Sequence, residues 1–112
     1  MHNDVVAMYN ALIARGLSSE DILLLEGKLN RQLLMNLIGE VNNRAATWKS
    51  GEVFIHYSGH GTFTGNTASE ARAGMLLARD KPSNKSNRIF WDEMFAAVRL
   101  QVNVRLILLP DC

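Results

Sequence analysis

The sequence predicts an α/β fold in which a mostly parallel central sheet carries helices on both of its faces. Short apolar runs alternate along the chain with longer segments of helical periodicity, and this alternation is typical of parallel strands joined by right-handed crossovers. The chain has 112 residues, which is enough for one small domain. Its hydrophobic content of 47% and charged content of 21% are ordinary for a globular protein.

The first expected elements are a helix and a short strand. Residues 5–15 have apolar side chains at helical spacing, and Asn3 or Asp4 can cap the start of this helix. Gly16 is expected to end it. The apolar run at 21–25 (DILLL) is followed by Glu-Gly and predicts a buried strand.

A longer helix is expected next, followed by the second strand. Residues 30–48 predict a helix with Asn30 as its cap. Its apolar stripe is formed by Leu33, Leu34, Leu37, Ile38 and Val41. Ser50-Gly51 has turn composition, and residues 52–57 predict a strand.

The second half of the chain predicts a loop, two strands, a turn and a helix. Residues 62–72 are small and polar and predict a loop, residues 75–78 a short strand, and residues 81–87 (KPSNKSN) a turn. Residues 105–109 predict the last strand. Residues 89–100 predict a helix whose inward side chains are Phe90, Met94, Phe95 and Val98.

Two residues whose side chains are suited to catalysis each follow one of these strands. His60 follows strand 52–57 in the sequence HYSGHG, and Cys112 follows strand 105–109. In open parallel sheets, functional groups gather at the carboxyl ends of the strands. We therefore expect His60 and Cys112 at the same edge of the sheet.

A cysteine beside a histidine is suited to nucleophilic catalysis. The thiolate is the reactive species, and histidine is the usual partner that generates it near neutral pH. Glycines on both sides of His60 permit tight turns and close approach of a substrate. The Gly61 and Cys112 N–H groups can together stabilise an oxyanion. His56 and His2 are expected to be non-catalytic, and histidines so far apart do not predict a metal site.

The segment VFIHYSGHGT resembles the histidine strand of the caspase-like cysteine peptidases of clan CD, above all the metacaspase and orthocaspase branch. Other segments resemble that family in the same order, over almost the whole chain. They are HNDV for the first helix, EDILLLEG for the second strand, LNRQLLMNLIGEV for the helix before the histidine, LLARD for the segment after the histidine loop, RIFWDEMFAAV for the next helix, and RLILLPDC for the strand that delivers the nucleophile.

The resemblance implies a caspase p20-like domain, a three-layer sandwich, and a cysteine-type endopeptidase that acts on protein or peptide substrates. In this role Cys112 would attack the scissile carbonyl, His60 would protonate the leaving amine, and Gly61 would donate to the oxyanion. The family positions that hold a basic substrate residue match Asp4 and Ser58. Because a carboxylate forms charge-assisted pairs with guanidinium groups, cleavage after Arg or Lys is expected.

The chain also departs from the family pattern. The family has an acid two residues before the cysteine, and this chain has Pro110 there. Asp111 is one place along, and on a strand it faces the other side from Pro110. The resemblance further implies that a domain spanning 1–112 is incomplete at both ends. It would lack a first strand before Asn3, and His-Ser-Gly with at least one further strand after Cys112.

Two other interpretations of the sequence stay open. The chain can be a truncated or degenerate caspase-like module that binds peptides or partners without turnover. In either case its own C-terminal subunit or a partner chain would complete the sheet. In a third interpretation, the backbone amides of SGHG bind a phosphate, but the lysine and the glycine spacing of a phosphate loop are absent from that segment.

Cofactor, nucleic acid and membrane interactions are not expected. The dyad chemistry needs no cofactor; many metacaspases need calcium, but no acidic cluster of the sequence matches their site. The net charge of +1 gives no electrostatic attraction to nucleic acid or anionic membranes. No apolar run approaches the roughly 20 residues that span a bilayer, and the first residues are polar. One cysteine fits a reducing compartment, so a cytoplasmic location is expected.

Overall fold

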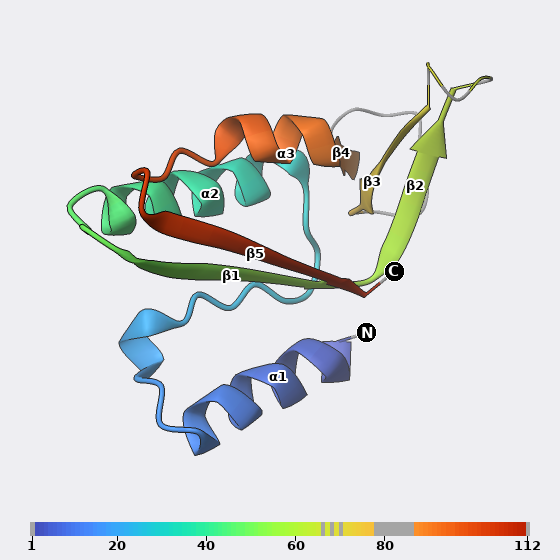
Figure 1. Ribbon diagram of the computed structural model, residues 1–112. Coiled ribbons are helices and arrows are strands. Elements are labelled where there is room, and N and C mark those ends of the chain that lie inside the picture. Colours follow the sequence, from blue (N-terminus) through green and yellow to red (C-terminus); the bar gives the residue numbers. More distant parts are fainter. Residues whose placement is uncertain (1, 66, 68, 70, 78–86, 112) are drawn as a thin grey trace.

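The computed structural model describes residues 2–65, 67, 69, 71–77 and 87–111, which form a mixed α/β structure (Figure 1). The elements in order are α1 (His2–Ala14), the 3₁₀ turn η1 (Ser19–Asp21), α2 (Arg31–Ala45), β1 (Gly51–Ser58), β2 (His60–Thr64), β3 (Arg72–Leu76), β4 (Arg88–Phe90), α3 (Trp91–Ala97) and β5 (Val104–Asp111).

Strands β1 and β5 form a two-stranded parallel sheet. Their register runs without a break from Gly51 opposite Val104 to Ser58 opposite Asp111. Helix α1 lies on one side of this sheet, and α2 and α3 lie on the other (Figure 1). The predicted parallel pairing of the strands that precede His60 and Cys112 is therefore confirmed, with helices on both sides.

The remaining described strands form a separate antiparallel sheet in the order β2-β3-β4. The expectation of a loop over 62–72 is wrong at both ends, because Thr62, Phe63 and Thr64 pair with β3 and Arg72 is its first residue. β-Branched and aromatic side chains favour strands, and here they outweigh the small polar residues around them. Two parallel and three antiparallel strands replace the expected single, mostly parallel sheet.

The two longer helices agree with the predicted ranges within a few residues. α1 begins at His2, so Asn3 and Asp4 lie in its first turn and not at its cap. Gly16 follows its end with a φ of 98°, as expected of a glycine that ends a helix. Helix α2 begins as predicted, since the Asn30 side chain accepts a hydrogen bond of 2.8 Å from the Leu33 N–H.

The predicted strand at 21–25 is wrong. Asp21 closes η1, and residues 22–26 belong to no strand. A strand needs a neighbour for its backbone N–H and C=O groups, and no strand of the described residues pairs with this run. Its Leu24 is accordingly 39% exposed.

The helix predicted over 89–100 is shorter than expected. Ile89 and Phe90 pair with β3 instead, and the helix starts at Trp91 and ends at Ala97. Phe95, expected to face inward, is 49% exposed. The short strand predicted from Met75 is present in β3, whereas residues 78 and 81–86 lie outside the described part of the chain.

One apolar core joins α2 and α3 to both sheets. Its buried members are Leu34, Ile38, Tyr57, Met75, Ile89 and Met94. Met75, Ile89 and Met94 are almost completely buried, whereas Leu33 of the predicted stripe is 42% exposed. In the part of the chain that the structure covers, no helix has the length and apolar character needed to cross a membrane.

Candidate functional site

The carboxyl ends of β1 and β5 lie side by side. Ser58 is opposite Asp111, and the Gly59 N–H donates a hydrogen bond of 3.0 Å to the Asp111 carbonyl oxygen. The chain turns from this point into β2, whose first residue is His60. Cys112 follows Asp111 in the sequence and lies outside the described residues. The structure therefore places one member of the predicted dyad and the residue that precedes the other.

Tyr57 fixes the backbone of His60. The tyrosine is 9% exposed, and its hydroxyl lies 2.7 Å from the His60 carbonyl oxygen and 2.9 Å from that of Leu76. His60 is opposite Leu76 in the antiparallel sheet, and its own side chain is exposed. The Tyr57 hydroxyl thus contacts the first residue of β2 and the last residue of β3, while the His60 side chain is exposed.

Gly59 is explained by the position of this tyrosine. A Cβ atom on Gly59 would lie 2.5 Å from the Tyr57 hydroxyl oxygen, which is too close for any side chain. The residue has no positive φ, so space and not backbone handedness requires a glycine here. Gly61, the predicted oxyanion donor, lies in β2 opposite Met75.

The two predicted substrate-binding residues are in direct contact. The Ser58 hydroxyl donates a hydrogen bond of 3.0 Å to Asp4 Oδ2. Asp4 comes from the first turn of α1 and Ser58 from the last residue of β1. Residues far apart in the sequence therefore meet at the end of the sheet where His60 is also found.

A shallow hollow of about 350 Å³ adjoins this pair. It is lined by Asp4, Ala7, Met8 and Ala11 of α1, His56 of β1, and Asp111 of β5. Because strand side chains alternate between faces, Asp111 shares the face of Ser58, and Pro110, opposite Tyr57, is on the other. Two carboxylates therefore line the hollow, and the Ser58 hydroxyl is bonded to one of them.

Sequence reasoning missed the contribution of Asp111 and His56 to this hollow. Asp111 could have been found only from the register of β1 and β5, which pairs it with Ser58. That register cannot be read from the residue types alone. His56 Nδ1 lies 3.2 Å from the Leu109 carbonyl oxygen, so a ring N–H donates to the neighbouring strand. Within the described residues, no group of three or more His, Cys, Asp or Glu side chains can hold a metal ion.

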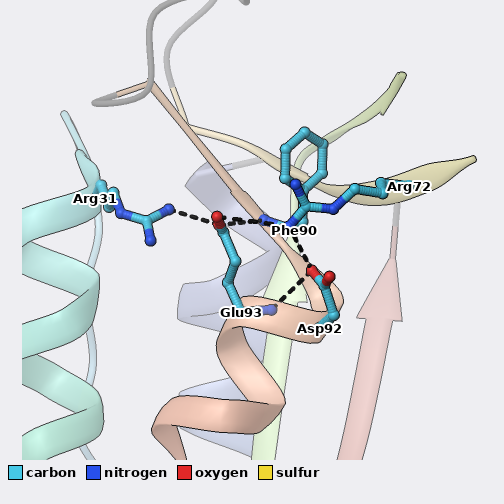
Figure 2. Close-up of polar contacts among 5 residues, drawn as sticks. All are labelled: Arg31, Arg72, Phe90, Asp92 and Glu93. Atoms are coloured by element: carbon cyan, nitrogen blue, oxygen red, sulfur yellow. Dashed lines mark hydrogen bonds and ion pairs between the residues drawn. The ribbon is translucent and has the colours of Figure 1, made fainter. Parts of the chain in front are cut away.

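A second polar cluster joins α2, β3 and the start of α3 (Figure 2). Arg31 Nη1 donates to Glu93 Oε2 at 2.6 Å, and Arg72 Nη2 donates to Asp92 Oδ1 at 2.9 Å. The Phe90 N–H also donates to Glu93 Oε2, at 3.1 Å, as the glutamate of a capping box does. Nothing in the sequence indicated this cluster, because its members come from three separate segments.

These contacts shift the acid–base properties of the cluster. The hydrogen bond from Arg72 lowers the pKa of Asp92, and the same bond raises the pKa of Arg72. Partial burial by itself raises the pKa of Glu93, but hydrogen bonds from Arg31 and the Phe90 N–H, with the charges of Arg31 and Arg72, hold that pKa below its usual value. Both carboxylates are thus stabilised in their charged form.

Comparison with known proteins gives no relative: models of protein families, curated proteins and solved structures were all searched, and none matches the chain.

Proposed function

We propose that this chain is a caspase-like cysteine endopeptidase domain with His60 and Cys112 as its catalytic dyad. The observation that carries the proposal is the parallel register of β1 and β5, in which the Gly59 N–H contacts the Asp111 carbonyl. In the sequence, His60 directly follows Gly59, and Cys112 directly follows Asp111. The three-layer caspase-like sandwich is part of this proposal.

The proposed reaction is acyl transfer followed by hydrolysis. The Cys112 thiolate attacks the carbonyl carbon of the scissile peptide bond, and a tetrahedral oxyanion forms. The N–H groups of Gly61 and Cys112 stabilise this oxyanion. When the C–N bond breaks, His60 gives its proton to the leaving amine. Water then hydrolyses the thioester, which releases the acid and restores the thiol.

We propose that the hollow beside Asp4 accepts a basic side chain of the substrate. Asp4 and Asp111 provide two carboxylates, and Ser58 provides a hydroxyl that already bonds to Asp4. A guanidinium group has five N–H donors and pairs well with carboxylates. In this arrangement Asp111 supplies the second acid of the subsite, whereas Pro110 lies on the other face of β5.

The reactivity of Cys112 tests the dyad directly. It is the only cysteine of the chain, so alkylation by iodoacetamide reports on it alone. We expect alkylation faster than that of a free thiol at pH 7, and slower alkylation in His60→Ala because the thiolate loses its partner. His56→Ala is the matched control and should alkylate at the wild-type rate. Equal rates in wild type and His60→Ala would refute the dyad.

The alternative function is a peptide-binding module without turnover, and Pro110 favours it. A proline stands in β5 where the resembling family has an acid that contacts the substrate. Such a module would bind Arg-containing peptides and never cleave them. Incubation of the intact chain with a peptide library, read by mass spectrometry, separates the two functions.

A further inference from the structure

Strand β2 is an outer strand of the antiparallel sheet. Among the described strands it pairs with β3 only, so one of its edges carries backbone groups that none of these strands covers. The strand begins at His60, directly after Gly59, whose N–H donates to the Asp111 carbonyl oxygen at the end of β5. This edge therefore starts at the proposed active site and runs away from it (Figure 1).

The hydrogen bonds of β3 show which residues of β2 face this edge. The Leu77 N–H donates a hydrogen bond of 2.6 Å to the Asn87 carbonyl oxygen. These two residues are the pair that follows Leu76 and Arg88 in the β3–β4 register. Because hydrogen-bonded pairs alternate with non-hydrogen-bonded pairs in an antiparallel ladder, the backbone groups of Leu76 and Gly74 point the other way, to β2.

Gly61 and Phe63 therefore direct their backbone groups to the outer edge. Thr62 is opposite Gly74, so the N–H and C=O groups of Thr62 point to β3 and those of its two neighbours point away. The N–H groups of Gly61 and Phe63 thus lie on the same side of the strand, two residues and about 7 Å apart. This orientation suits a Gly61 N–H that donates to a substrate carbonyl oxygen.

The side chain of Phe63 adds an apolar surface to this edge. Gly61 is opposite Met75, and Phe63, two residues further, shares their face of the sheet. Met75 is 2% exposed on this face, whereas Phe63 is 67% exposed. In β-augmentation, main-chain hydrogen bonds give affinity and contacts to alternate side chains give specificity. The edge of β2 offers both kinds of contact.

We infer that substrates bind the edge of β2 as an additional strand, in which an apolar side chain contacts Phe63. This inference rests on the proposed peptidase function. When the Gly61 N–H donates to the scissile carbonyl, the peptide residue two positions away reaches Phe63, because both extended chains advance about 3.3 Å per residue. The occupant is an extended peptide substrate, since the edge is continuous with the strand end that carries His60.

A positional scan tests the side-chain contact. Peptides with one central Arg carry Leu at a single position up to four residues away on either side, and a matched series carries Ser. We expect Leu two residues from the Arg, on one side only, to raise kcat/KM several-fold over Ser. In Phe63→Thr, which keeps the backbone groups and the strand propensity, this ratio should fall to near one. Phe95→Thr, on α3 and 49% exposed in the wild type, is the control and should keep the wild-type ratio.

Methylation of the peptide backbone tests the added strand. Each peptide carries one N-methyl group, either two or three residues from the Arg, on the side that the Leu scan identifies. Because alternate N–H groups of a strand point to the same neighbour, one of these two peptides should lose kcat/KM several-fold and the other should not. Equal losses for both peptides, or no loss for either, would overturn the pairing with β2.

Binding measured without turnover separates this inference from the proposed function. Fluorescence anisotropy on Cys112→Ala compares the best Leu peptide with its Ser counterpart. Tighter binding of the Leu peptide, lost when Phe63→Thr is added, supports the inference even if no peptide is cleaved. Cleavage after Arg with equal rates and equal affinities for Leu and Ser peptides would overturn it and leave the peptidase standing.

Two further results would also overturn the inference. One is self-association that Phe63→Thr abolishes, without any Leu preference, which would assign the edge to a second copy of the chain. The other is the absence of both cleavage and a Leu preference.

Discussion

Asp111 shows how much a single residue depends on its neighbours in space. Its place in the hollow follows from the pairing of Ser58 with Asp111. If the register of β5 shifted by one residue, the Asp111 side chain would project to the other face of the sheet. Asp4 and Ser58 were predictable as a pair, because the sequence resembles one subsite of the caspase-like family at both positions. Asp111 was not, because its role requires knowing which face of β5 meets α1.

The two carboxylates of the hollow give a prediction about specificity. Asp4→Asn and Asp111→Asn should each lower kcat/KM for substrates cleaved after Arg by about tenfold, because each variant removes a charge-assisted hydrogen bond. Asp21→Asn, exposed in η1, is the control. The measurement compares kcat/KM for peptides that carry Arg before the scissile bond with kcat/KM for peptides that carry Gln there. Preferential cleavage after Asp in the wild type would contradict a basic-residue subsite.

Among the elements, local signals predicted helices better than strands. The start of α2 could be predicted because its cap and apolar spacing lie within one short segment. The run at 21–25 was a poor prediction, because strand formation depends on a partner elsewhere in the chain. The prediction of a loop over 62–72 was wrong for a related reason: β3 provides a pairing partner for Thr62–Thr64, and the sequence does not show this partner.

The cap of α2 gives a prediction about stability. Asn30→Ala should lower the free energy of unfolding by about 1 kcal/mol, because the Leu33 N–H loses its acceptor. Urea denaturation measures this loss of stability, which should appear as a lower midpoint with an unchanged m-value. Asn103→Ala, in the exposed turn before β5, should change the midpoint little. Equal effects of the two substitutions would show that the cap does not stabilise α2.

Glu93 links three elements and gives a prediction about pH. Its pKa is lower in the folded chain than in the unfolded chain, so its contribution to stability is present above its unfolded pKa, about 4.3. That contribution is lost as the pH falls through the folded pKa. Glu93→Gln should therefore lower the melting temperature at pH 7 and reduce its dependence on pH below about 4.3. If the melting temperatures of wild type and variant changed with pH in parallel, this role of Glu93 would be contradicted.

At the scale of the whole molecule, the fold leaves much apolar surface in contact with water. The accessible surface is 7601 Å², against about 6,200 Å² for a typical monomer of this mass. Phe54 is 61% exposed and Phe63 67%. Both sheets are small, and edge strands with unpaired backbone groups promote association.

We therefore expect the chain to self-associate or to need a partner segment that covers these surfaces. Size-exclusion chromatography with light scattering should show a mass that rises with concentration. The double variant Phe54→Ser and Phe63→Ser should reduce this rise, because it removes the two most exposed aromatic side chains given above. A single monomeric species that melts cooperatively at all concentrations would refute the expectation.

The contact between the Tyr57 hydroxyl and the two carbonyl groups has a consequence for motion. Among the described strands, the parallel and antiparallel sheets share no ladder of hydrogen bonds, and Gly59 is the one residue between β1 of the first sheet and β2 of the second. Elements joined in this way can open as separate cooperative units. His60 belongs by its pairing to the antiparallel sheet, so we expect its position relative to β5 to change when the β2–β3 pair opens. We expect the Tyr57 hydroxyl to limit this motion, because its contacts tie the end of β1 to His60 and Leu76.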